Sequence, residues 1–244
     1  MQSRFSPLSR KHSIGSAVSE QIVIERHFRG PTESGNGGYT CGLVASFVDG
    51  PAEVTLRLPP PLDTRLRVER ADRAVRVFDA DRLVAEAKPG VVDVEPVDPP
   101  AFEVASRAAL PEGDLDSPFP QCFVCGPHRP PGDGLRIFAG PLHDRVVTAP
   151  WVPTGRYTGP EFVWSALDCP GAYACGFGER GVLVLGRLAA RVDALPRAGE
   201  RCVVVGWPLG EEGRKAYAGT ALYGEGGRLL GVARATWIEP LSLA

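Results

Sequence analysis

Three polar side chains, Glu161, Ser165 and Asp168, recur at the spacing expected for one face of a helix. At about 100° per residue they project from the same side of the stretch 158–172. A carboxylate in such a position can act as a general base that activates water. Asp168 is therefore the first candidate catalytic residue, and Ser165 could orient a substrate or water. Each also has an ordinary interpretation as a solvated residue on a helix surface.

The start of this stretch carries helix signals. Thr158 or Gly159 can cap the helix, and Pro160 suits the first turn, where its missing N–H costs no hydrogen bond. Glu161 is favoured there by the helix dipole, and the same helix start could bind a substrate carbonyl oxygen. Pro170 either kinks or ends the helix, which could aim the catalytic carboxylate or simply stop the element.

A second polar group, Asn36-Gly37-Gly38, ends a turn-rich loop and precedes a short apolar segment, 39–48, that could be a helix. Asn36 can cap that helix. It could instead act in catalysis by holding a water molecule or a carbonyl oxygen, together with the N–H groups of Gly37 and Gly38. That role requires a fold that brings these residues near Asp168.

Cys122 and Cys125 form one Cys-x-x-Cys pair, which could complete a four-ligand zinc site with His128 and His143. A single pair is a weak metal signal, so we expect packed thiols and no stoichiometric zinc. The sequence contains no nucleophile-elbow motif and no convincing phosphate-binding glycine motif, and we expect no cofactor.

The remaining pattern predicts two similar halves. Each contains a strand, a glycine-rich loop, a helix and about four antiparallel strands with period-two alternation. Strands are expected at 52–58, 63–71, 73–79 and 82–88, then near 134–139 and 144–151, and at 181–193, 200–207, 214–224 and 228–238. We divide the chain into a disordered leader (1–19), an N-terminal domain (20–90), a proline- and acid-rich linker without a core element (91–120) and a C-terminal domain (121–240).

Composition and charge argue against some classes of partner and location. The net charge of −2 does not call for a nucleic acid partner, and no apolar stretch is long enough to span a membrane. The first 19 residues lack the apolar core of a secretory signal, so we expect reduced thiols and a cytoplasmic protein. The abundance of Ala, Gly, Pro, Arg and Val favours a bacterial source with a GC-rich genome.

The sequence resembles the hotdog-fold thioesterase-like superfamily. The segments that carry the resemblance are 122–127, followed by 134–138, and the helix 162–172, with a looser match at Gly30-Pro31 and 36–40. The resemblance implies an α+β double hotdog, in which two antiparallel sheets, each wrapped round a central helix, form an intramolecular pseudo-dimer. Two features depart from the pattern: the loop before the second helix has no histidine, and the first helix has no carboxylate.

The resemblance also implies a chemistry. In such proteins an acidic residue commonly activates water against a thioester, and a helix N-terminus binds the carbonyl oxygen. Our first hypothesis is an acyl-CoA thioesterase-like hydrolase with Asp168 as base and the helix start near Glu161 as oxyanion site. The implied partner is a small-molecule acyl thioester on coenzyme A or a carrier, with a possible homodimer of the chain.

Two alternatives remain open. The protein could hold an acyl or aromatic ligand without turnover. It could also be an enoyl-CoA hydratase or dehydratase, because His27, followed by Phe28-Arg29-Gly30-Pro31, is similar to the histidine segment of hotdog dehydratases. A histidine there could abstract a proton next to a thioester carbonyl; the ordinary interpretation is a histidine at the end of a strand.

Overall fold

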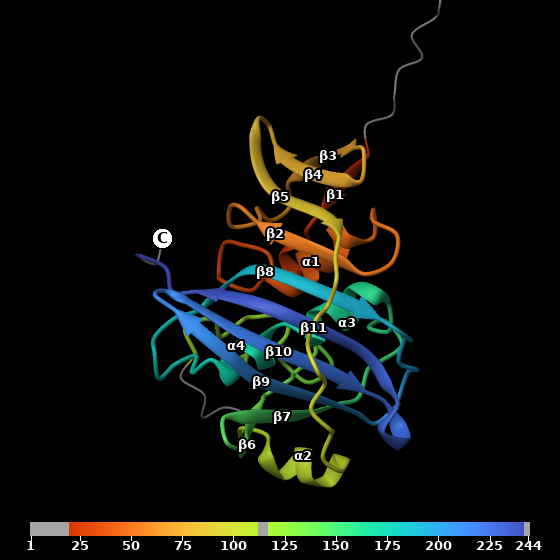
Figure 1. Ribbon diagram of the computed structural model, residues 1–244, viewed down its shortest axis with the longest axis vertical. Coiled ribbons are helices and arrows are strands. Elements are labelled where there is room, and N and C mark those ends of the chain that lie inside the picture. The colour runs from red at the N-terminus through yellow and green to blue at the C-terminus, as the bar shows by residue number, and fades with distance from the viewer. Residues whose placement is uncertain (1–19, 112–116, 242–244) are drawn as a thin grey trace, which may run out of the picture.

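A single antiparallel sheet organises the computed structural model, which describes residues 20–111 and 117–241. Its eleven strands follow the order β1-β3-β4-β5-β2-β8-β11-β10-β9-β7-β6 (Figure 1). The strands of the two halves meet where β2 pairs with β8, with Val54 opposite Leu188. The expected α+β double hotdog is confirmed, with the two sheets joined edge to edge. The predicted leader, 1–19, lies outside the described residues.

From residue 20 onward, where the structure describes it, the N-terminal unit supplies one α-helix and five strands. Its elements are β1 (Gln21–Val23), the short 3-10 helix η1 (Arg26–Phe28), α1 (Gly37–Ala45), β2 (Ala52–Leu56), β3 (Arg65–Ala71), β4 (Ala74–Asp79) and β5 (Arg82–Pro89). The predicted strands lie within one or two residues of these bounds. Alternation buries one face, as at Ala52 and Val54, and turns that face toward α1.

The C-terminal unit, described over residues 117–241, supplies two short α-helices and six strands. Its elements are β6 (Gly140–His143), β7 (Val146–Trp151), α3 (Pro160–Ala166), α4 (Cys169–Ala174), β8 (Val184–Val192), β9 (Cys202–Glu212), β10 (Lys215–Tyr223), the 3-10 helix η2 (Glu225–Gly227) and β11 (Leu229–Ile238). The predicted single helix is therefore two helices. Among the described residues, no helix is long and apolar enough to cross a membrane.

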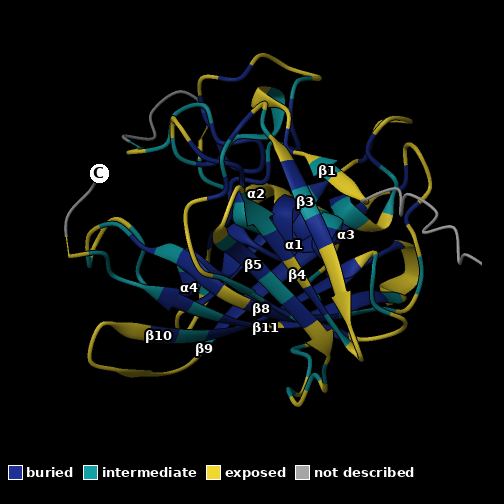
Figure 2. Cartoon of the chain, turned by 90° about the horizontal axis from the view of Figure 1, so that it is seen from above, coloured by how far each residue is buried: buried dark blue, intermediate teal, exposed yellow. Residues whose placement is uncertain are grey.

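The two central helices, α1 and α3, pack directly against each other inside the sheet, where buried residues gather (Figure 2). Glycine permits this close approach at two positions one turn apart. A Cβ added at Gly38 would lie 2.5 Å from the Cβ of Asp168, and one added at Gly42 would lie 2.6 Å from the Cα of Glu161. The helices run in opposite directions, so the start of α1 meets the end of α3.

The structure of the linker differs from the prediction. Residues 91–120 were expected to lack a core element, yet they include α2 (Phe102–Ala108), in which Ala105 is fully buried. The linker runs along the outer face of the C-terminal sheet (Figure 1), where Val92, Val94, Val97 and Phe102 pack against buried side chains of β7, β9, β10 and β11. Its isolated apolar residues, spaced between prolines, cover a sheet face that would otherwise be exposed.

The strand expected near 134–139 is also wrong. Arg136 has a positive φ of 55°, which interrupts a strand. Instead, the N–H groups of Leu135 and Ile137 donate to the carbonyl oxygens of Phe123 and Val124. This segment therefore braces the Cys122–Gly126 turn, and the first strand of the C-terminal unit begins at Gly140.

Candidate active site

Asp168 lies at the break between α3 and α4. Its backbone is non-helical, with φ −85° and ψ −85°. Pro170 has no N–H to donate to the carbonyl of Ala166, so the helix cannot continue through this point without losing a hydrogen bond. Because α3 ends at Ala166 and Pro170 lies in the first turn of α4, the structure shows the end of a helix rather than a kink within it. Although Asp168 occupies the N-cap position of α4, its side chain makes no cap hydrogen bond there.

The Asp168 carboxylate instead points to the start of α1, in the other unit. Its Oδ2 accepts hydrogen bonds from Asn36 Nδ2 and from the N–H of Gly38, both at 2.9 Å. Its Oδ1 is buried and has no hydrogen-bond partner among the described residues. Burial raises the pKa of Asp168 to about 7, although Gly38 and Asn36 favour the charged form. One oxygen is thus held and the other can accept a proton.

Asn36 both caps α1 and holds the carboxylate, which combines the two roles considered for it. Its Oδ1 accepts the N–H of Tyr39 at 2.8 Å, and its Nδ2 donates to Asp168. The N–H of Gly37, the first residue of the helix, has no hydrogen-bond partner among the described residues, and Gly37 is only partly buried. The predicted meeting of Asn36, Gly37 and Gly38 with Asp168 therefore occurs.

This arrangement combines the two groups needed for attack on a carbonyl. Asp168 Oδ1 is a proton acceptor, and Oδ2 of the same carboxylate is bonded to the start of α1, where the dipole is positive and where the Gly37 N–H has no partner in the described part of the chain. Gly37 is the available donor, because the N–H of Gly38 is already bonded to Asp168. The carboxylate comes from the C-terminal unit and the N–H groups come from the N-terminal unit.

The other two predicted site residues do not direct their side chains at this pair of groups. Ser165 is fully buried, and its hydroxyl donates within the helix to the carbonyl oxygen of Glu161 at 2.7 Å. Glu161 lies in the first turn of α3, at the opposite end of that helix from Asp168. The start of α3, where Glu161 lies, faces the later turns of α1. The carboxylate of Asp168 contacts the start of α1 instead.

His27 takes part in a separate polar chain. Its Nε2 lies 3.0 Å from the Tyr157 hydroxyl, and its Nδ1 lies 3.3 Å from Asp133 Oδ1. Burial lowers the pKa of His27, against the opposing charge of Asp133. Because both ring nitrogens have partners, His27 is less available as a proton acceptor than Asp168 Oδ1. Sequence reasoning missed Tyr157 and Asp133, since neither belongs to a recognisable spacing with His27.

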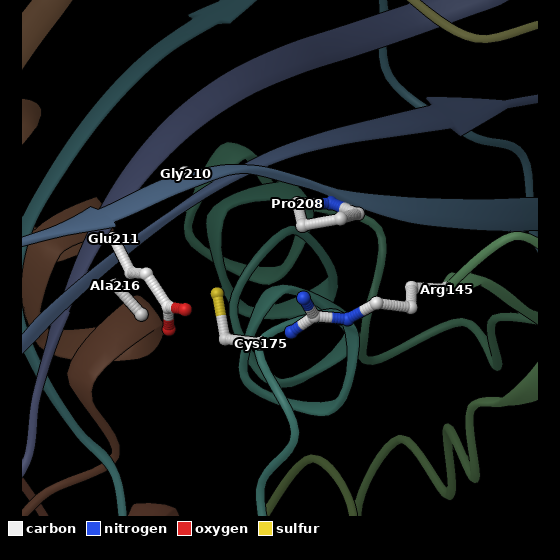
Figure 3. Close-up of a pocket in the computed structure, with 6 residues that line it drawn as sticks. All are labelled: Arg145, Cys175, Pro208, Gly210, Glu211 and Ala216. Atoms are coloured by element: carbon white, nitrogen blue, oxygen red, sulfur yellow. The ribbon is translucent and has the colours of Figure 1, made fainter.

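Two cavities lie away from Asp168. One, of about 220 Å³, is lined by Arg145, Cys175, Pro208, Gly210, Glu211 and Ala216 (Figure 3). The other, of about 330 Å³, lies between the units at the end of α1 and the start of α3, and includes Ala45, Ser46, Pro160 and Trp164. Asp168 itself is 2% exposed, so access to it requires movement of the side chains that cover it.

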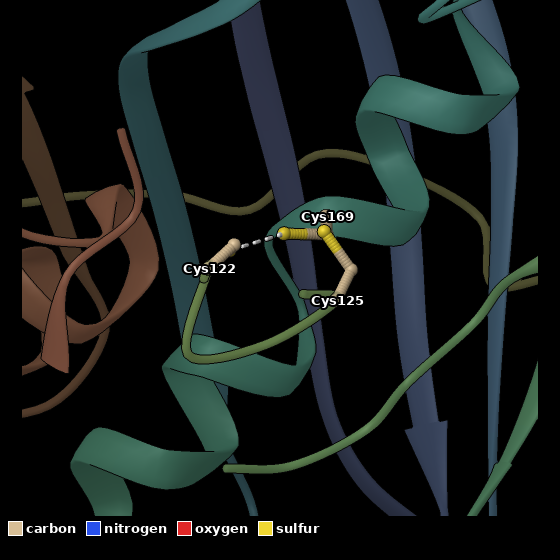
Figure 4. A group of neighbouring side chains, drawn as sticks. All are labelled: Cys122, Cys125 and Cys169. Carbon is tan, nitrogen blue, oxygen red and sulfur yellow. Dashed lines mark hydrogen bonds between the residues drawn. The ribbon is translucent and has the colours of Figure 1, made fainter. Parts of the chain in front are cut away.

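A third thiol joins the Cys-x-x-Cys pair. Cys122, Cys125 and Cys169 gather next to the site (Figure 4). His128 and His143, the partners considered from sequence, are exposed and do not join this group. Cys169 directly follows Asp168 in the sequence. It is not at a short, regular spacing from Cys122 and Cys125, so nothing in the sequence groups it with them as a metal ligand.

No family model matches the sequence, and no curated protein matches it. Solved structures do match. A protein of unknown function with a hot dog fold from Alicyclobacillus acidocaldarius is 10% identical, over 91% of this chain and 93% of that chain, with a TM-score of 0.61. A putative thioesterase from Novosphingobium aromaticivorans is 14% identical, over 90% and 94%, with a TM-score of 0.60.

The TesB protein of Mycobacterium avium subspecies paratuberculosis is 14% identical, over 86% of this chain and 89% of that chain, with a TM-score of 0.57. These alignments cover both units. The chain therefore has the double hotdog fold found in thioesterase-like proteins, as the resemblance of its motifs predicted.

Proposed function

We propose that the protein hydrolyses an acyl thioester, carried by coenzyme A or by a carrier protein, with Asp168 as the general base. One observation carries the proposal. Asp168 Oδ2 is fixed by Asn36 and Gly38, Oδ1 has no partner among the described residues, and the unpaired N–H of Gly37 lies at the same helix start. General-base and oxyanion-binding groups are thereby held at one junction between the units.

The reaction follows from these two groups. A water molecule bonded to Asp168 Oδ1 gives a proton to the carboxylate while its oxygen attacks the thioester carbonyl carbon. The carbonyl oxygen becomes an oxyanion and accepts the N–H of Gly37. The C–S bond then breaks, and the proton on Asp168 passes to the departing sulfur. The products are a free thiol and a carboxylic acid, and the step consumes no cofactor.

The closed state of the site favours one alternative, a binding protein. Asp168 is almost fully buried, whereas the cavity of about 330 Å³ between the units is open to a ligand and lined by apolar residues such as Val48, Trp164 and Val192. Such a cavity can hold an acyl chain without any turnover. The same cavity is also compatible with an enzyme that binds part of its substrate there.

The test compares Asp168→Asn with Glu161→Gln on a panel of acyl-CoAs, with free thiol release as the signal. Asparagine keeps the shape of the side chain and an oxygen for the Gly38 N–H, but it cannot accept the proton from water. Hydrolysis should fall by roughly 10²-fold or more in Asp168→Asn, the usual range for loss of a general base. Glu161→Gln should lose much less, because Glu161 lies at the far end of α3.

Melting temperatures of both variants separate a chemical effect from unfolding. Full activity of Asp168→Asn would remove the base from the proposal. Absence of thiol release from every acyl-CoA and carrier-bound substrate, with acyl-CoA binding retained, would favour the binding protein. Conversion of an enoyl-CoA without thiol release, lost in His27→Ala, would favour the hydratase.

A further inference from the structure

Three cysteines form a compact group beside the catalytic junction. The sulfur atoms of Cys122, Cys125 and Cys169 all lie within 4.8 Å of one another, and those of Cys122 and Cys169 are 3.9 Å apart (Figure 4). All three residues are buried and none forms a disulfide. Around a tetrahedral zinc ion with Zn–S bonds of about 2.3 Å, sulfur atoms lie about 3.8 Å apart. The group therefore needs only small side-chain movements to surround one ion.

A tight turn presents two of the sulfurs on one side of the backbone. The N–H of Gly126 donates to the carbonyl of Cys122 at 2.8 Å, and a Cβ at Gly126 would lie 2.5 Å from Cys122 backbone atoms. Only glycine fits this position without a shift of the turn. The backbone bonds from Leu135 and Ile137 hold the turn from outside. The first two ligands are thus positioned before any ion binds.

A hydrogen-bond donor faces one of the sulfurs, as around metal-bound thiolates. The side-chain amide of Asn36, which also donates to Asp168, has its Nδ2 3.8 Å from Cys122 Sγ. Such a donor suits a sulfur atom that carries negative charge, whereas a packed apolar thiol would need none.

We propose that Cys122, Cys125 and Cys169 bind one Zn²⁺ ion as three thiolate ligands. An all-sulfur set selects thiophilic ions such as zinc over magnesium or calcium. Each Zn–S bond replaces an S–H bond, so three protons leave to the buffer and no oxidation occurs. Among the described residues, no other cysteine, histidine or carboxylate joins the group, which leaves the fourth position to water.

This proposal revises the sequence-based expectation of no zinc, which considered only His128 and His143 as further ligands. It goes beyond the proposed hydrolysis, because the ion takes no part in the proton transfer. The ion would tie the Cys122–Gly126 turn to the first residue of α4, directly after Asp168. The zinc ion would therefore position the segment that follows Asp168, and bound zinc can be measured without an assay of hydrolysis.

The test uses the full-length protein, purified under reducing conditions without chelator or metal-affinity steps. Native mass spectrometry and elemental analysis should give about one zinc per chain. Cys122→Ser, Cys125→Ser and Cys169→Ser should each lose most of that zinc. Cys202→Ser is the matched control, because Cys202 is equally buried but lies outside the group, and it should keep the ion.

A second measurement does not depend on folding of the variants. The zinc-free wild-type protein, kept reduced, is titrated with Co²⁺, and thiolate coordination should produce sulfur-to-cobalt charge-transfer absorption that saturates at one equivalent. Zinc should also raise the melting temperature of the zinc-free protein. Wild-type protein without zinc and without the cobalt absorption would overturn the proposal, as would full zinc retention in all three serine variants.

Discussion

Gly38→Ala tests the junction between α1 and α3 by a single methyl group. An alanine Cβ at this position would lie 2.5 Å from Asp168 Cβ, 2.7 Å from the Trp164 carbonyl oxygen and 3.0 Å from Ser165 Cα. Ordinary carbon contacts are about 3.5–4.0 Å, so the helices must separate by about 1 Å. Two of the obstructing atoms are backbone, which cannot rotate away. The movement therefore displaces the carboxylate relative to the start of α1.

The expected loss of stability is modest. Overpacking of a well-packed core costs about 1–3 kcal/mol, and alanine regains about 1 kcal/mol of helix propensity relative to glycine. The net loss of about 0–2 kcal/mol corresponds to a fall in melting temperature of at most about 8 °C for a domain of this size. The expected loss of activity is much larger, because a misplacement of about 1 Å in a catalytic group can cost roughly 10²-fold.

Gly42→Ala is the matched control. Its Cβ would meet Glu161 Cα at 2.6 Å and Trp164 Cβ at 3.0 Å, so it overpacks the same helix contact one turn away from Asp168. We expect a similar fall in melting temperature with a smaller loss of thioester hydrolysis. Gly155→Ala, where an added Cβ meets nothing within 4 Å, should change neither quantity. Equal activity of Gly38→Ala and the parent protein would refute the assigned geometry.

Three other predictions concern the rest of the molecule. Burial would raise the pKa of Glu200, but N–H groups of Arg197 and Glu225 and the Arg228 guanidinium hold it below its ordinary value. Glu200→Gln should therefore cost about 1–3 kcal/mol at pH 7, and urea unfolding should show this difference shrink as the pH falls below the ordinary pKa of glutamate and through the lowered pKa of the native carboxylate; a constant difference would contradict the assignment. His27→Ala should leave thioester hydrolysis within a few-fold of the parent rate, because both ring nitrogens are engaged away from Asp168; abolished hydrolysis would move the site to the first half. Separate halves, divided within 90–120, should not fold as monomers, because each exposes the edge strand, β2 or β8, that pairs with the other; a cooperative melting transition of either monomeric half would contradict this.

The junction between Asn36 and Asp168 could be predicted from the sequence because its parts depend on local rules. Asn36 before two glycines predicts a capped helix, and the structure has that cap. The motif around Asp168 carried enough resemblance to predict a second central helix in a double hotdog. The meeting of Asn36 with Asp168 then followed from the pseudo-dimer, in which each helix faces the other unit.

Other features could not be predicted because they depend on contacts between distant segments. The break at Asp168 needed the combined effect of Pro170 and the carboxylate bond to Gly38, 130 residues away in the sequence. Helical periodicity put Ser165 on an open face, but the neighbouring unit buries it. The linker helix α2 has only seven residues, too few to show a helical repeat, and only the sheet beneath it explains why Ala105 is buried.

The antiparallel pairing of α1 and α3 leaves the two ends of the helix pair unequal. At one end the start of α1 meets Asp168; at the other the start of α3 lies beside Ala45 and Ser46, and α1 contains no acidic residue. In a symmetric homodimer every substitution would occur at both ends of the helix pair. In this chain the two units have separate sequences, so the residues at one end can change while those at the other end stay the same. A non-hydrolysable thioester analogue should accordingly saturate the Asp168 end at one molecule per chain, and the other end is free to bind a different ligand without a change at Asp168.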